Sequence, residues 1–192
     1  MVYRKHRQSE PAKMTPGHSA RDHLTRGRVE AQALDANGHM NVAAYTAVFD
    51  QAMEAWLKEH GLGVEPHAAD PGGVFVLESH VRYQRELRAD EEYAVTGQLI
   101  ACDEKRAHLF LRMRNLTRNL QAATCELLLI HVDLTSRHAA PWPETVHHRL
   151  IRALREDAKL GRPVEVGARI AIERSRFDPA RLFMEGGAQD KG

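Results

Sequence analysis

Residues 35–50 read Asp-Ala-Asn-Gly-His-Met-Asn-Val-Ala-Ala-Tyr-Thr-Ala-Val-Phe-Asp, and the two halves of this stretch differ in character. The first half alternates small or apolar residues with polar ones, namely Asp35, Asn37, His39 and Asn41. The second half starts an apolar pattern with three- and four-residue spacing, which is typical of one face of a helix. That face comprises Val42, Tyr45, Phe49, Ala52 and Trp56. The sequence therefore predicts titratable and amide groups at the N-terminus of a long buried helix.

The predicted helix has recognisable ends. Asn41 is a good N-cap, because its side chain can accept a hydrogen bond from the free backbone N–H groups of the first turn. The helix is expected to run from residue 42 to residue 59 and to stop at Gly61, a favourable C-cap. The free N–H groups and the positive end of the helix dipole would attract a developing oxyanion beside the polar cluster.

Alternation of apolar and polar residues predicts strands on both sides of this helix. We expect a strand at 28–34, a loop at 61–73, four strands at 74–85, 93–100, 107–116 and 121–134, a helix at 144–157 and a short strand at 164–172. In the second strand, one face is expected to carry Phe75, Leu77, Val81 and Tyr83, and the other Glu78, His80 and Arg82. This order indicates an antiparallel sheet with a helix on one face.

Composition sets the class of protein. The 192 residues suffice for one domain, which we expect at 21–160, between a flexible leader at 1–20 and a partly mobile extension at 161–192. A net charge of +1 gives no reason to expect nucleic acid as a partner. The two cysteines form no Cys-x-x-Cys pair, and no signal peptide or membrane-spanning stretch is recognisable, so we expect a cytoplasmic protein. The 12 histidines are scattered without His-Glu-x-x-His, and no metal site is expected.

The pattern Asp-x-Asn-Gly-His-x-Asn, followed by Tyr45 and an apolar helix, resembles the hotdog-fold thioesterases of the 4-hydroxybenzoyl-CoA and acyl-acyl-carrier-protein type. The resemblance implies an α+β hotdog fold, in which an antiparallel sheet wraps around one long central helix, here with a C-terminal helix added. It also implies hydrolysis of an acyl-CoA, no cofactor beyond the coenzyme A of the substrate, and a homodimer or homotetramer with the site between protomers. Many relatives carry Asn or His where this chain has Val42, so proton transfer assigned to that position cannot be carried over.

The resemblance places catalysis on Asp35, Asn37 and His39. Thioester hydrolysis needs a positioned water or a carboxylate nucleophile, together with donors for the carbonyl oxygen. Asp35 can act as general base or nucleophile, or merely cap a turn; His39 can orient a water, protonate the departing thiolate or bond the loop. Asn41 can face the thioester as well as cap the helix, and Asn37 can hold the loop. Glu78, on a strand that lies near a neighbouring protomer in that family, is the candidate for a second acidic group.

Further residues are candidates for holding the substrate. Gly38 would let the acyl group approach the backbone closely. The remaining substrate-binding candidates are Tyr45, Phe49, Trp56, Phe75 and His80, and the candidates for the coenzyme A phosphates are Arg82, Arg112 and Arg114. For the aromatic residues a place in the core, and for the charged ones a solvated sheet face, is the alternative.

Three short segments carry a narrower resemblance. Residues 76–82, 103–110 and 131–133 look like segments of the betainyl-CoA thioesterases that accompany carnitine dehydrogenase. That substrate would require a pocket for a quaternary ammonium, which favours aromatic faces and an anionic neighbour. Phe49, Trp56 and Phe75, with Glu78, could supply them.

Two other functions stay open at this point. A hotdog hydratase or dehydratase uses Asp and His in an Asp-x-Asn-Pro-x-His loop, but the spacing here is one residue shorter and Gly38 stands where that proline would be. A non-catalytic acyl-CoA-binding hotdog protein is the other alternative, in which the Asp35 motif would have no evident purpose.

Overall fold

The computed structural model describes residues 23–62 and 72–170. The elements in these ranges are β1 (Thr25–Arg28), a 3-10 helix η1 (Ala31–Ala33), α1 (Val42–Glu59), β2 (Gly72–Tyr83), β3 (Glu92–Cys102), β4 (Arg106–Asn115), β5 (Leu120–Asp133), β6 (His138–Ala139) and α2 (Glu144–Ala158). The chain divides into two compact units, 1–162 and 163–192, and all of these elements belong to the first. In the second unit, residues 164–167 form a turn in which Val166 N–H donates to the Pro163 carbonyl at 3.2 Å.

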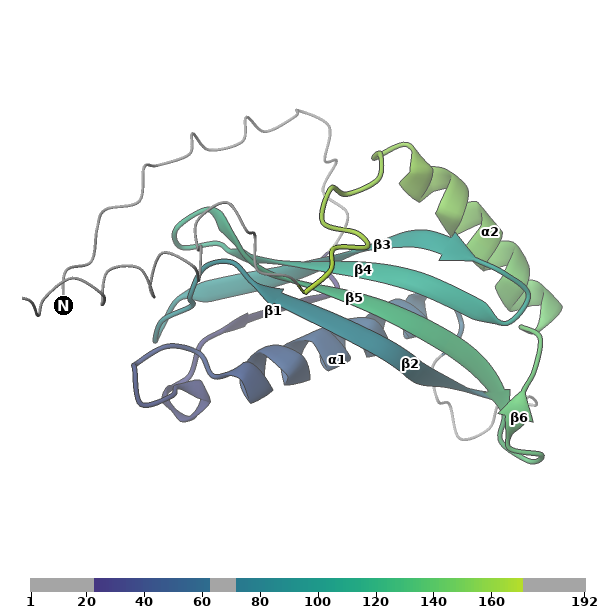
Figure 1. Cartoon of the computed structure of the whole chain (residues 1–192), viewed down its shortest axis with the longest axis horizontal. Coiled ribbons are helices and arrows are strands. Elements are labelled where there is room, and N and C mark those ends of the chain that lie inside the picture. The colour runs from purple at the N-terminus through teal and green to yellow at the C-terminus, as the bar shows by residue number, and fades with distance from the viewer. Residues whose placement is uncertain (1–22, 63–71, 171–192) are drawn as a thin grey trace, which may run out of the picture. The chain divides into compact units, whose positions relative to one another are not determined.

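One antiparallel sheet runs in the order β1-β3-β4-β5-β2, with β6 paired to β5. Figure 1 shows α1 lying along one face of this sheet. The alternate residues of β4 and β5 that face α1 are buried in one apolar cluster with it, among them Leu109, Leu111, Cys125 and Leu127. The sheet wrapped on one long helix, expected from the sequence, is confirmed.

The central helix α1 forms as its sequence predicts. The Asn41 side chain caps it by accepting a hydrogen bond from Ala44 N–H at 2.9 Å. The chain leaves the helix through His60 and Gly61, the latter at φ +78°, a left-handed conformation that favours glycine. The buried face comprises Tyr45, Val48, Phe49, Ala52, Met53, Trp56 and Leu57. Local periodicity and capping thus place the N-terminus of α1, where the polar motif begins.

The second helix covers an edge of the sheet. Because β1 pairs only with residues 92–95 of β3, the rest of that edge is open to another element, and α2 packs there (Figure 1). Asp157 of α2 is buried, and its Oδ2 accepts a hydrogen bond from Leu99 N–H at 2.6 Å. Gln98 donates to the backbone carbonyl of Asp157 at 3.2 Å. The edge amide of β3 is therefore satisfied by a side chain instead of a neighbouring strand.

Three expectations were wrong. The strand predicted at 28–34 ends at Arg28, and its alanines form η1, because alanine has little preference for strands and the chain turns back toward α1. The strand predicted at 164–172 is a turn over 164–167, where Gly167 has φ +75°; residues 171–172 lie outside the described residues. In β2 the register shifts between Val76 and Glu78, so that Phe75 is not on the face of Val81. The leader and the end of the extension also lie outside the described residues, and the predicted domain limits stay predictions.

Candidate active site

Residues 34–41 form a tight turn that leads into α1. Leu34 and Met40 pair as an isolated bridge, Asp35 N–H donates to the His39 carbonyl at 2.8 Å, and Gly38 N–H donates to the Asp35 carbonyl at 3.0 Å. Gly38 has φ +78°, and a Cβ placed there would meet nothing within 4 Å. Glycine is therefore favoured here by its positive φ and not by a lack of space for a side chain. The turn brings Leu34 and Met40, at its two ends, together.

Asp35 is held by the backbone of its own turn. Its Oδ1 accepts hydrogen bonds from Asn37 N–H at 2.8 Å and His39 N–H at 3.2 Å. These two bonds lower the pKa of Asp35 below its ordinary value, since they favour the charged carboxylate. The carboxylate is consequently ionised at neutral pH, and its second oxygen, Oδ2, accepts neither of these two bonds.

His39 meets a residue that was not among the predicted candidates. Its Nε2 lies 3.0 Å from Oε2 of Glu86, and its backbone pairs with Arg88. Arg88 also donates from Nε to Oε1 of Glu86 at 2.8 Å. Sequence reasoning missed Glu86 because it comes 47 positions after His39, and no local pattern links the two.

The two asparagines of the motif make hydrogen bonds that shape the turn. Asn41 donates from Nδ2 to the Ala33 carbonyl at 2.9 Å while its Oδ1 caps α1, so both ends of its amide are engaged. Asn37 is exposed, and its backbone N–H serves Asp35. The structure thus brings Asn37 and Asn41 beside Asp35 and His39 and gives each a role in shaping the turn.

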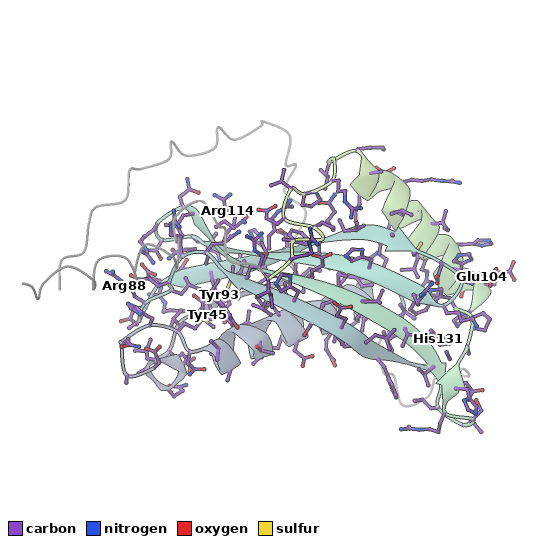
Figure 2. All side chains as sticks on the ribbon, in the orientation of Figure 1. Tyr45, Arg88, Tyr93, Glu104, Arg114 and His131 are labelled. Atoms are coloured by element: carbon purple, nitrogen blue, oxygen red, sulfur yellow. The ribbon has the colours of Figure 1, made fainter. Side chains whose placement is uncertain are left out.

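Tyr45 anchors the segment that carries Glu86. Its buried hydroxyl accepts a hydrogen bond from Leu87 N–H at 3.0 Å and lies 3.5 Å from the Arg85 carbonyl, to which it donates. Desolvation raises the pKa of Tyr45. Figure 2 shows Tyr45 and Arg88 at the same end of the sheet, beside the start of α1. Through these two hydrogen bonds Tyr45 fixes the backbone on either side of Glu86.

Two aromatic candidates belong to the core. Phe49 is 2% exposed and Trp56 is 3% exposed. Trp56 stacks on His60 with ring centroids 4.2 Å apart, and it comes fifteen residues after Asn41, about 22 Å further along a helix. The structure does not bring Trp56 to the turn.

The candidates on β2 lie on the other face of the sheet. Glu78 and His80 pair with Leu128 and Glu126, which alternate with the core residues of β5 and so point away from α1. Because of the register shift, Phe75, paired with Ile130, shares that face. Within one protomer the structure therefore unites Phe75 with Glu78 and His80 but does not bring them to Asp35.

The predicted phosphate-binding arginines share this outer face. Arg82 and Arg112 both pair with Thr124, from opposite sides, and Arg114 donates to Asn119 Oδ1 at 2.6 Å. Figure 2 shows Arg114 across the sheet from Tyr45. These arginines form a basic row on one side of the sheet, apart from the turn.

Comparison with known proteins identifies the family to which the chain belongs. The sequence model of the thioesterase-like superfamily matches residues 29–150, which span the turn, α1 and the other four strands of the sheet path, β2 to β5. This chain belongs to the thioesterase-like superfamily. Its fold, with the sheet curled on α1, is the hotdog fold.

Individual proteins also align with most of this chain. An L-carnitine dehydrogenase/betainyl-CoA thioesterase of Rhizobium meliloti is 30% identical over 77% of this chain and 29% of its own length. A betainyl-CoA thioesterase of Pseudomonas aeruginosa is 29% identical over 72% of this chain and 87% of its own. A hypothetical protein of Staphylococcus aureus, solved in complex with CoA, is 26% identical with a TM-score of 0.72, covering 78% of this chain and 94% of that one.

The chain thus spans less than a third of the length of the Rhizobium protein, whose name joins two activities. No helix in the described part of this superfamily member is long and apolar enough to span a membrane.

Proposed function

We propose that this protein hydrolyses a small acyl-CoA to the free acid and coenzyme A. The observation that carries the proposal is the turn at residues 35–39, which holds an ionised carboxylate and a paired imidazole at the N-terminus of α1, in a chain of the thioesterase-like superfamily. No cofactor is needed beyond the coenzyme A that forms part of the substrate.

Asp35 is proposed as the nucleophile. The backbone hydrogen bonds from His39 and Asn37 lower its pKa and keep it ionised, and an ionised carboxylate can attack the thioester carbon. The attack forms an acyl–Asp35 anhydride and expels the coenzyme A thiolate. The N-terminus of α1 lies directly after the turn, where its dipole stabilises negative charge on the carbonyl oxygen.

Betainyl-CoA is the proposed substrate, because two relatives that align over most of this chain are named for it. The acyl group carries a quaternary ammonium, which aromatic rings and carboxylates attract. Phe75 already accepts a cation, since the Arg137 guanidinium lies 5.6 Å from the centre of its ring, and Glu78 shares its face of β2. Glu78, His80 and Phe75 are proposed to bind the acyl group across a protomer boundary.

We also propose a homodimer or homotetramer. β2 is the outermost strand of the sheet beside β5, and it exposes three consecutive apolar side chains, Phe75, Val76 and Leu77. An exposed apolar edge strand invites pairing with a second copy. Size-exclusion chromatography with light scattering should show an oligomer that Leu77→Lys weakens and Leu160→Lys, at an exposed position after α2, does not.

Two finer assignments belong to the same proposal. Arg82, Arg112 and Arg114 are proposed to bind the phosphates of coenzyme A from their row on the sheet; CoA product inhibition should weaken in Arg82→Met. The free cysteines, Cys102 and Cys125, fit a reducing cytoplasm.

The test is thiol release from a panel of acyl-CoAs that includes betainyl-CoA, with wild type, Asp35→Asn and Asp50→Asn. Asp50 is an exposed residue of α1 and serves as the matched control. Asp35→Asn should lose at least about a hundredfold in kcat, as expected for removing a nucleophile, and Asp50→Asn should not. Thiol release that survives in Asp35→Asn would reject the nucleophile, and release from none of the thioesters would favour a hydratase or a binding protein.

A further inference from the structure

Glu86 is the one carboxylate that the structure places directly on the imidazole of the motif among the described residues. Its Oε2 lies 3.0 Å from Nε2 of His39, which is hydrogen-bonding distance. Both side chains are about one-third exposed, so the pair lies at the surface of the protomer and can be reached by a substrate.

Several contacts hold Glu86 in place. Arg88 occupies its other oxygen, Oε1, and Arg118 donates to its backbone carbonyl. The next residue, Leu87, is fully buried. Its carbonyl accepts a hydrogen bond from Met40 N–H at 2.7 Å, and its own N–H donates to the Tyr45 hydroxyl. A side chain held in this way can hold the ring of His39 in one orientation.

This contact settles which ring nitrogen is free for chemistry. A carboxylate accepts hydrogen bonds only, so Nε2 of a neutral His39 must carry the proton that Glu86 accepts. Nδ1 then has the lone pair and can take a proton from water. A carboxylate that orients a histidine and stabilises its protonated form is the arrangement by which enzymes set the tautomer of a catalytic base.

We infer that Glu86 is a positioning residue that fixes the tautomer of His39, so that Nδ1 acts as the base for the water that releases the acyl group from Asp35. The inference rests on the proposed function and names the base for the second step of that reaction, the hydrolysis of acyl–Asp35. The water oxygen bonds to the acyl carbon, one water proton moves to Nδ1, and the bond from that carbon to the Asp35 oxygen breaks with its electron pair returning to the carboxylate. The proton on Nδ1 then passes to solvent, and the coenzyme A thiolate, which has left in the first step, takes its own proton from solvent.

The test separates the two halves of the reaction. Rapid mixing with acyl-CoA measures thiol release within the first turnover and in the steady state, for wild type and the variants Glu86→Gln, Glu86→Leu and His39→Gln. Glu92→Gln is the control, since Glu92 forms comparable exposed ion pairs with Arg26 and Arg28 on β1. Because general acid–base catalysis contributes about 10²–10⁴-fold, we expect His39→Gln to fall within this range and Glu86→Leu to lose at least about tenfold in steady-state kcat, with little change in KM.

The first turnover should stay fast in these variants, so that thiol appears as a burst of one equivalent per site. Glu86→Gln, whose amide oxygen can still accept from Nε2, should retain more activity than Glu86→Leu. In a ¹⁵N spectrum of the neutral ring, His39 should carry its proton on Nε2 in wild type and lose that preference in Glu86→Leu. Thermal unfolding checks that each variant is folded.

Equal steady-state rates in wild type and Glu86→Leu, or a His39 tautomer unchanged by that substitution, would overturn the inference while leaving thioester hydrolysis intact. Absence of thiol release in wild type would instead reject the proposed function. A slow first turnover in Glu86→Leu with no burst would place His39 in the acylation step and also overturn the assignment.

Discussion

Removing one buried hydroxyl should show how the site is held. Tyr45→Phe takes away the acceptor of Leu87 N–H, a bond of 3.0 Å between a fully buried leucine and a tyrosine that is 4% exposed. A buried donor left without a partner costs about 1–3 kcal/mol. The phenyl ring still fills the same space and keeps the edge-to-face contact with Tyr83 at 5.2 Å, so no cavity adds to this cost.

We expect the free energy of unfolding of Tyr45→Phe, from urea denaturation, to fall by about 2 kcal/mol, and the melting temperature by roughly 4–8 °C for a domain of this size. Hydrogen exchange of the Leu87 amide should accelerate more than that of Leu99, whose acceptor is Asp157. Tyr83→Phe is the control, because Tyr83 is 49% exposed and should change stability by less than about 0.5 kcal/mol. If both substitutions cost the same, the Tyr45 hydroxyl does not support residues 85–88, and the account of how Glu86 is fixed fails.

Three further predictions concern other parts of the fold. Asp157→Ala should lower the free energy of unfolding by about 1–3 kcal/mol in urea denaturation, since it leaves the buried Leu99 N–H without its acceptor, and Asp157→Asn should cost less; equal losses would contradict this role. The Arg106 side chain lowers the pKa of Asp103 from 3.8 to about 2, so Asp103 stabilises the fold above about pH 4 and loses this contribution as the pH falls toward 2. The difference in urea midpoint between wild type and Asp103→Asn should therefore shrink from pH 5 to pH 3, and it should correspond to less than about 1 kcal/mol because the pair is exposed. Burial raises the pKa of Cys125 to about 12, so mass spectrometry after iodoacetamide treatment at pH 8 should find this thiol unmodified in the native protein and modified in urea; rapid native labelling would refute its burial.

The sequence by itself determined the parts of this protein that depend on neighbours along the chain. The bounds of α1, its Asn41 cap and its apolar face follow from three- and four-residue spacing, and the structure reproduces them at Val42–Glu59. The long strands follow from two-residue alternation, and the polar residues before the apolar helix pattern indicate where the helix begins. The resemblance to the hotdog-fold thioesterases came from the same stretch, and the match of the thioesterase-like superfamily model over residues 29–150 shows the family.

Only the tertiary structure decided which distant side chains meet. His39 meets Glu86, and Tyr45 meets Leu87, through contacts between residues more than forty positions apart. One extra residue at the register shift of β2 moves Phe75 to the face of Glu78, and no alternation rule can foresee it, because the side-chain period of two inverts at a bulge. Short-range periodicity fixes each element, whereas the register between elements depends on packing that is summed over the whole fold.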